Sequence, residues 1–137
     1  MVDQISALDR KQIEGVKSSG GVSLFMAIEA LAQLGALHAR FLTEFKKHCF
    51  LLTIDHLDVS ATSFSGGPLR LYGSLIGQTR RAFSYAVQAT NEEKTFLYGQ
   101  LVFAATDYDG RFRREHLEGH YRRIFACLTK DLPGSSH

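Results

Sequence analysis

One carboxylate stands inside the most apolar run of this sequence. Glu29 lies in SSGGVSLFMAIEALAQLGALHARF, residues 18–41, shortly after a glycine-rich break. A carboxylate that loses contact with water has a raised pKa, which is the condition for general acid or base catalysis near neutral pH, although a nearby helix N-terminus acts in the opposite direction. Glu29 is therefore the candidate catalytic residue, on the condition that a partner subunit or an acyl chain covers its half of the segment.

A solvent-exposed helix face is the simpler interpretation of Glu29. At 100° per residue, Glu29 falls within about 60° of six other positions that are mostly polar. This predicted polar stripe consists of Glu29, Gln33, Ala36, Arg40, Thr43, Glu44 and Lys47. The residues expected to face a sheet are Phe25, Ile28, Leu31, Ala32, Leu34 and Leu42. Spacing alone leaves both interpretations open.

The histidines give weaker signals. His116 and His120 have the i,i+4 spacing of metal ligands, but HLEGH lacks the His-Glu-x-x-His order and an evident third ligand, so no metal site is expected. His38 lies about 180° from Glu29 on the predicted helix and cannot share its site within one chain. His56 belongs to a later strand, and we expect a structural or surface role for both His38 and His56.

The elements that must hold Glu29 begin with a hairpin and a long helix. Extended pieces around residues 2–6 and 11–17, with a bend at Asp9, predict the hairpin. Residues 22–45 are strong helix formers, and they predict a central helix about 35 Å long.

Two residues refine this predicted helix. Ser23 is a suitable N-cap because its hydroxyl can accept from an amide of the first turn. Gly35 in mid-helix costs about 1 kcal/mol relative to alanine, and it indicates that the sheet backbone approaches closely there.

A sheet follows the helix. The run CFLLTIDHLDVSA, residues 49–61, has the residue types and length of a strand. Further strands are expected in PLRLYGSLIGQTRRA, AFSYAVQA and TFLYGQLVFAATDYDG. Because short polar links such as TNEEK join them, they predict an antiparallel meander. The fold class is therefore α+β, with the sheet wrapped around the long helix.

A second helix is expected near the C-terminus. The segment RREHLEGHYRRIFACLTKDL carries apolar residues at helical spacing. They are Leu117, Tyr121, Ile124, Phe125 and Leu128. We expect one domain over residues 1–130 and a disordered tail over residues 131–137.

Composition narrows the class of protein. The sequence has 137 residues, and 16 Lys+Arg against 14 Asp+Glu give a net charge of +2, too small to suggest a nucleic-acid partner. Cys49 and Cys127 form no framework or zinc spacing, so two reduced, buried thiols in a cytoplasmic protein are expected. No export signal is evident, and no apolar run approaches the roughly 18 residues that span a bilayer.

One segment resembles a known family. IEALAQLGAL, residues 28–37, is similar to the central-helix motif of the 3-hydroxyacyl-(acyl carrier protein) dehydratases, which have the hotdog fold. VDQI and KQIEGVK resemble that family's first two strands, and the resemblance continues through the GGP loop and the TRRA hairpin to about residue 107. It implies a hotdog fold, in which a highly curved antiparallel sheet wraps a long central helix, and a homodimer or higher homo-oligomer without a cofactor.

The resemblance also implies an activity. Glu29 matches the family's helix glutamate, which works with a histidine from the other subunit on 3-hydroxyacyl thioesters of acyl carrier protein in fatty-acid or polyketide-type metabolism. The family's His-Phe-Pro-Gly segment has no match, because the short SSGGVS stands in its place. The preferred prediction is a dehydratase-like protein that acts on or binds these thioesters. Dehydration needs one group to take a proton and another to protonate the leaving hydroxyl, so the sequence leaves open whether dehydratase activity is kept or lost.

Two other functions stay open. A thioesterase would use Glu29 as nucleophile or base while the helix N-terminus polarises the thioester carbonyl. A non-catalytic protein would keep the fold and bind an acyl chain or a carrier protein. The residues expected to line the substrate site are Gly20, Gly21, Val22, Met26 and Gln33.

Basic residues could recognise an acidic carrier protein. They are Arg80 and Arg81 in the TRRA hairpin, with Arg113 and Arg114 at the start of the C-terminal helix. Such a rim would attract an acyl carrier protein and bind the phosphopantetheine phosphate, whereas solvated arginines on a capping helix are the simpler alternative. No nucleic acid and no stable membrane insertion are expected.

Overall fold

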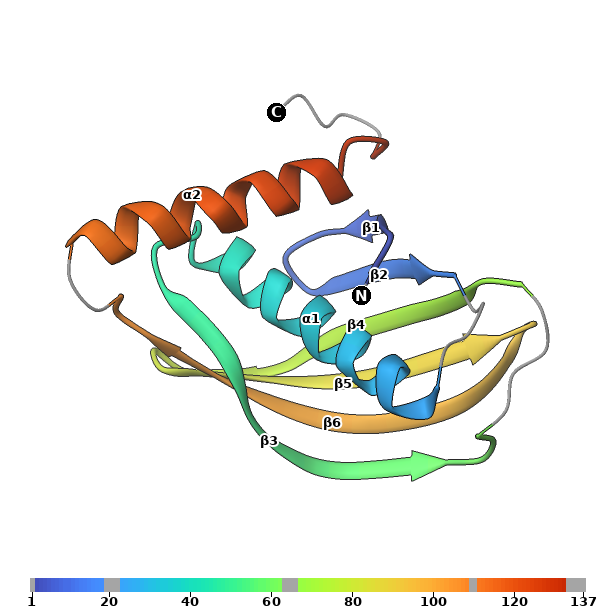
Figure 1. Cartoon of the computed structure of the whole chain (residues 1–137). Coiled ribbons are helices and arrows are strands. Elements are labelled where there is room, and N and C mark those ends of the chain that lie inside the picture. Colours follow the sequence, from blue (N-terminus) through green and yellow to red (C-terminus); the bar gives the residue numbers. More distant parts are fainter. Residues whose placement is uncertain (1, 19–22, 63–66, 109–110, 133–137) are drawn as a thin grey trace.

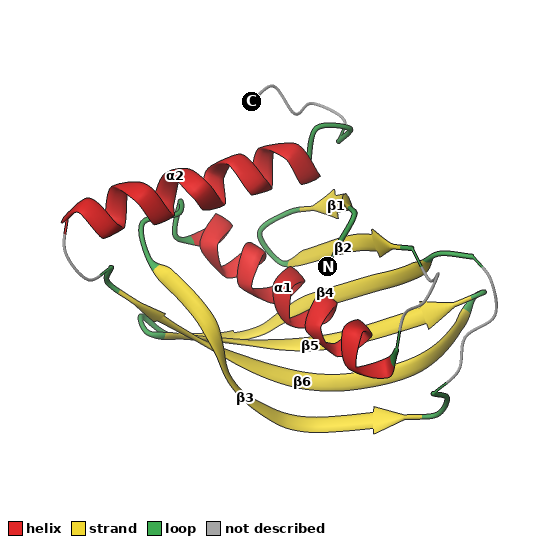
Figure 2. Ribbon diagram, viewed as in Figure 1, coloured by secondary structure: helices red, strands yellow, loops and turns green. Residues whose placement is uncertain are grey.

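The computed structural model describes residues 2–18, 23–62, 67–108 and 111–132, except the side chains of 111 and 112. One curved, six-stranded antiparallel sheet wraps the helix α1, and a second helix, α2, lies across the end of the molecule where α1 ends (Figures 1 and 2). The elements are β1 (Gln4–Leu8), β2 (Gln12–Lys17), α1 (Leu24–Leu42), β3 (His48–Val59), β4 (Leu69–Gln78), β5 (Ala82–Asn91), β6 (Lys94–Thr106) and α2 (Arg111–Leu128). The predicted α+β arrangement is confirmed.

The sheet has the strand order β1-β2-β4-β5-β6-β3, and each neighbouring pair is antiparallel. The strand that follows α1, β3, therefore lies at one edge, and β1 lies at the other. The predicted N-terminal hairpin is present, and Asp9 shapes its bend by accepting hydrogen bonds from the amides of Lys11 and Gln12 at 2.7 and 2.9 Å.

Helix α1 begins at the predicted cap. The hydroxyl of Ser23 accepts a hydrogen bond from the amide of Met26 at 3.2 Å. The helix ends at Leu42, earlier than the predicted 45, because Glu44 and Phe45 have left-handed backbone angles, with φ of 57° and 62°. A right-handed helix cannot continue through two such residues.

The core lies between α1 and the concave face of the sheet. Its largest fully buried side chains come from both layers, among them Leu31, Leu34 and Leu37 from α1 and Phe83, Tyr85 and Phe103 from the sheet. Helix α2 closes one end of this core with Tyr121, Ile124, Phe125 and Leu128, as its spacing predicted.

The predicted solvent-exposed stripe on α1 is wrong at two of its seven positions. Ala36 and Arg40 are only 9% and 7% exposed. The Nη2 of Arg40 donates to the carbonyl of Cys49 at 2.5 Å, and its guanidinium lies 3.7 Å from the ring centre of Tyr121. Phe25, expected to face the sheet, is instead 67% exposed. A helical wheel gives directions around one helix but not which neighbours cover them.

The two cysteines differ. Cys49 is buried on β3, and burial raises the pKa of its thiol to about 11. Cys127 is exposed, contrary to the expectation of a buried thiol, because it lies on the face of α2 turned away from Phe125. No described helix is both long and apolar enough to cross a membrane.

The predicted tail begins with two described residues. Asp131 accepts a hydrogen bond from the side-chain amide of Gln4 at 3.3 Å, and the amide of Leu132 donates to the carbonyl of Thr129 at 3.0 Å. The rest of the tail, residues 133–137, lies outside the described residues.

Gly35 permits close packing of α1 on the sheet, although the neighbour is a side chain and not the predicted backbone. A Cβ atom at Gly35 would lie 2.5 Å from Cζ of the fully buried Phe103. We expect Gly35→Ala to lower the free energy of unfolding in urea by up to about 2 kcal/mol, since overpacking costs about 1–3 kcal/mol and helix propensity returns about 1 kcal/mol. The control Gly119→Ala in α2 meets only the flexible end of Arg123 and should not destabilise. Equal effects of the two substitutions would contradict this explanation.

Candidate functional site

Glu29 lies in the N-terminal half of α1 and is exposed in the single chain. On the helical wheel it lies about 20° from Arg40, whose guanidinium reaches β3. Gly35, which contacts Phe103 of the sheet, lies about 120° away from Glu29. Gln33, about 40° from Glu29, contacts Val2 next to β1 at the opposite edge of the sheet, so Glu29 lies on the side of α1 turned away from Phe103.

Apolar side chains surround this flank without being covered. Leu51, Ile54 and Val59 of β3 pair with Phe103, Leu101 and Leu97, which are all buried, so they point to the concave side of the sheet. They are nevertheless 36%, 42% and 38% exposed. Together with Phe25 and Met26 of α1, these residues form what we call the open face. Glu29 lies within a surface that a further molecule could cover.

Of the other predicted substrate residues, the structure describes Gln33 and Met26. The side-chain carbonyl of Gln33, one turn after Glu29, accepts a hydrogen bond from the amide of Val2 at 2.7 Å. The amide nitrogen of Gln33 is the group left to donate to a bound molecule. Met26 belongs to the open face, whereas Gly20, Gly21 and Val22 lie outside the described residues.

Neither His38 nor His56 shares the face of Glu29. His38 is completely buried; its Nε2 donates to the carbonyl of Asp9 at 2.7 Å, and its Nδ1 accepts from the hydroxyl of Tyr85 at 2.6 Å. Because a carbonyl can only accept, these contacts fix the neutral tautomer. His56 pairs with Gln100 on the convex side of the sheet and contacts Asp58 at 2.7 Å. The expected structural role of His38 and surface position of His56 are confirmed.

The buried His38 makes stability depend on pH. Burial lowers the pKa of His38, opposed by the carbonyl and the charge of Asp9 and assisted by the charge of Arg10. The unfolded chain then binds more protons than the folded chain below about pH 6.5, so the free energy of unfolding should fall as pH drops from 7 to 5, by up to about 1.4 kcal/mol per pH unit. Urea titrations measure this slope. His38→Gln should flatten it and the exposed control His120→Gln should not; a slope retained in His38→Gln would refute the assignment.

Three of the four predicted carrier-binding arginines cluster near one carboxylate. The Nζ of Lys47 lies 2.5 Å from Oδ1 of Asp107, and this contact lowers the pKa of Asp107, with further effects of Arg114 and Arg81. Arg80 and Arg81 line a cavity of about 520 Å³ with Lys47 and Asp107. Lys47, Arg80, Arg81 and Arg114 are called the basic cluster below, and Arg113 is exposed on α2 beside it.

The basic cluster and Glu29 lie at opposite ends of the folded molecule. Helix α1 runs away from Glu29 toward the end of the molecule that holds the β4–β5 hairpin and the start of α2 (Figure 1). Within one chain, therefore, the sheet and helix do not bring the predicted rim to the predicted catalytic residue.

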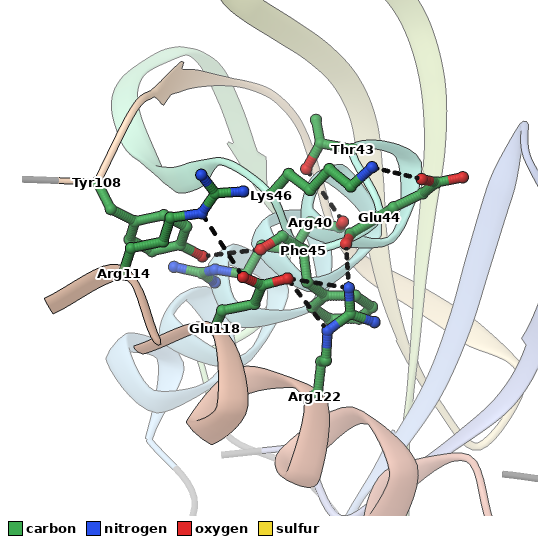
Figure 3. Close-up of polar contacts among 9 residues, drawn as sticks. All are labelled: Arg40, Thr43, Glu44, Phe45, Lys46, Tyr108, Arg114, Glu118 and Arg122. Carbon is green, nitrogen blue, oxygen red and sulfur yellow. Dashed lines mark hydrogen bonds and ion pairs between the residues drawn. The ribbon is translucent and has the colours of Figure 1, made fainter. Parts of the chain in front are cut away.

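Sequence reasoning missed a second group of polar contacts, between the end of α1 and α2 (Figure 3). Glu118 lies between Arg114 and Arg122, at 3.8 and 3.0 Å, and Nη2 of Arg122 donates to the carbonyl of Glu44 at 2.6 Å. The i,i+4 spacing of these three α2 residues was the available signal. In the described part of the chain, no group of three or more metal-ligating side chains occurs.

No protein-family model matches the sequence, and neither does any curated protein. Solved structures do match. A thioesterase from Haemophilus influenzae has a TM-score of 0.65 and 17% identity over 75% of this chain and 77% of that one. The chain has the hotdog fold.

Other hotdog-fold structures agree with this assignment. The dehydratase heterocomplex ApeI:P from Xenorhabdus doucetiae has a TM-score of 0.65 and 13% identity over 85% of this chain and 87% of that one. A Streptococcus mutans protein solved with acetyl CoA has a TM-score of 0.63 and 10% identity, covering 76% and 88% of the two chains. At these identities the similarity establishes the hotdog fold and leaves the activity to be argued from the site.

Proposed function

We propose that this hotdog protein hydrolyses acyl thioesters with Glu29 as its reactive carboxylate. The observation that carries the proposal is the position of Glu29 on an apolar open face, close to the N-terminus of α1 and without His38 or His56 on its side. One carboxylate is sufficient to activate water, whereas dehydration needs a second acid or base. The Haemophilus influenzae thioesterase and the acetyl CoA complex among the similar structures support this choice.

The reaction needs a base and a positive potential at the carbonyl oxygen. Glu29 takes a proton from water as the water oxygen attacks the thioester carbon. The positive end of α1 and the backbone amides of its first turn stabilise the oxyanion that forms. The C–S bond then breaks, the thiolate takes the proton, and a carboxylic acid and a free thiol leave.

Dehydration of 3-hydroxyacyl thioesters is the second candidate. The EALAQ motif around Glu29 and the dehydratase heterocomplex among the similar structures favour it. This reaction would require a second acid or base from another chain, because residues 19–22 are Ser-Gly-Gly-Val. A dehydratase-like protein that only binds such thioesters would keep the same surface without turnover.

A homodimer would complete the site. Edge strand β3 is twelve residues long, and its concave side contributes Leu51, Ile54 and Val59 to the open face. Antiparallel pairing of two β3 strands would extend the sheet and cover Glu29 on both subunits. It would also place the His48 end of one strand beside the Val59 end of the other. The basic cluster of the partner would then lie close to the α1 N-terminus, where it could bind the phosphate of a carrier-bound or coenzyme A thioester.

The decisive assay compares two substrates side by side. The protein is incubated with a saturated acyl thioester and with a 3-hydroxyacyl thioester, each attached to coenzyme A or to an acyl carrier protein, and free thiol and enoyl product are measured separately. Free thiol without enoyl product is the expected result. Enoyl product would replace the proposal with dehydration, and absence of both products would leave only the binding function.

A further inference from the structure

A cavity separate from Glu29 lies between the end of α1 and α2. Its volume is about 450 Å³, within the range of small-molecule sites, and its walls are mainly aromatic. Phe41 and Phe125 stack with ring centres 5.7 Å apart, and Phe45 meets Phe125 edge to face at 5.1 Å. Ala126 adds a small apolar wall. Such walls suit an apolar body of a few carbon atoms.

The rim of this cavity carries one cation, Arg122, and one carboxylate, Glu44, and both belong to a larger network of charges. Arg122 lies over the ring of Phe45, at 5.1 Å from its centre, and Glu44 stands at the same rim. Glu118 contacts both Arg114 and Arg122, and Glu44 contacts Lys46 at 3.4 Å (Figure 3). This network contains three cations and two carboxylates, of which Arg122 and Glu44 line the cavity itself.

Hydrogen bonds fix the position of the Arg122 side chain and still leave some of its N–H donors for a ligand. Its Nη2 donates to the carbonyl of Glu44 and to Glu118, and its Nε contacts Glu118 at 3.4 Å. A guanidinium has five N–H donors, so its second terminal nitrogen, Nη1, remains for an additional acceptor. A charge-assisted hydrogen bond from a prepositioned arginine to a carboxylate is among the stronger polar contacts in proteins.

The backbone beside the cavity is strained. Glu44 and Phe45 both have positive φ values, and neither is glycine. This conformation places the ring of Phe45 in the wall of the cavity, 6% exposed, and directs the carbonyl of Glu44 to Arg122. Residues held in such conformations cost free energy and occur at ligand-binding positions more often than elsewhere.

We propose that this cavity binds an amphiphilic monocarboxylate, with its apolar body against Phe41, Phe45 and Phe125 and its carboxylate on Arg122. The site stands at the opposite end of α1 from Glu29, so it is a second site and does not depend on the proposed hydrolysis. Carboxylic acids are also the product class of thioester hydrolysis. If both proposals hold, the cavity would bind the carboxylic acid product at a distance from the reacting atoms.

The test uses octanoate as the probe and the full chain as the protein. Binding is followed by calorimetry and by amide chemical shifts in NMR spectra, with octanol as the uncharged analogue. We expect saturable binding of octanoate at the α1–α2 junction. Arg122→Gln should weaken it at least about 10-fold, as loss of a charged hydrogen bond predicts. The adjacent control Arg123→Gln should change it less than about twofold, and octanol should bind both variants equally.

A cavity-filling variant tests the apolar part of the site independently of the charged part. Ala126→Phe leaves every charged side chain in place but occupies the apolar space, so octanoate and octanol should both lose binding. Three results would overturn the proposal: no saturable octanoate binding to the wild type, equal weakening by Arg122→Gln and Arg123→Gln, or shift changes confined to the half of α1 that holds Glu29. None of these results bears on thioester turnover, which is measured separately.

Discussion

Glu29→Gln should lower kcat for acyl thioester hydrolysis by about 10²–10⁴-fold, the usual contribution of a positioned general base. The substitution keeps the size and hydrogen-bonding capacity of the side chain but removes its ability to take a proton from water. Because Glu29 is exposed in the single chain, the fold should tolerate the change with an unaltered free energy of unfolding. KM should change little, since in the proposed site the acyl chain would contact the apolar open face and not the carboxylate.

The measurement is steady-state release of free thiol from a saturated acyl thioester. Glu115→Gln is the matched control, because it neutralises an exposed helical carboxylate on α2 while leaving α1 untouched. We expect the control to retain wild-type kcat. Equal turnover by Glu29→Gln and the wild type would exclude Glu29 as the base and would leave this surface as a binding site.

Ile54→Asp should convert the proposed dimer into a monomer of 15.3 kDa. Ile54 lies near the middle of β3, points to the concave side and is 42% exposed in the single chain. In antiparallel pairing of two β3 strands, each dimer would bury two such aspartates in an apolar interface. Burying unpaired like charges costs several kcal/mol, enough to dissociate a dimer at micromolar concentration.

Light scattering coupled to size-exclusion chromatography measures the mass. Ile76→Asp is the control, because Ile76 is 53% exposed on β4, away from the β3 edge. It should remain dimeric. A wild-type protein that is already monomeric would contradict the dimer, whereas a dimeric Ile54→Asp would exclude β3 as its interface. Loss of thioester turnover in the monomeric variant would show that the site needs both subunits.

Residues that are close together in the sequence were sufficient to predict the helices, strands and turns. The cap at Ser23, the bend at Asp9 and the period of α2 depend on residues close in the chain, and the structure has all three. The resemblance of IEALAQLGAL to a central-helix motif identified the hotdog fold although no family model matches. Gly35 signalled a close approach because glycine in mid-helix has a cost that only packing offsets.

The site was accessible to sequence reasoning only in part. Glu29 could be found from the sequence because a carboxylate in an apolar run is unusual. The surroundings of its helix face could not be predicted, because a helical wheel does not show which neighbouring elements cover each direction. Arg40 belongs to the same predicted stripe as Glu29 and is buried beneath Tyr121, whereas Phe25 is exposed. The difference arises from β3 and α2, which cover one half of the helix and leave the other open.

By itself, then, the sequence determined the type and order of the elements, the hotdog assignment and the candidate carboxylate. Only the tertiary structure decided that Glu29 faces an uncovered apolar surface and that the basic cluster stands at the far end of α1. It alone brought Arg122 of α2 to the strained end of α1. Such pairings depend on side chains that are distant in the chain, and burial and charge act through space, so no local pattern encodes them.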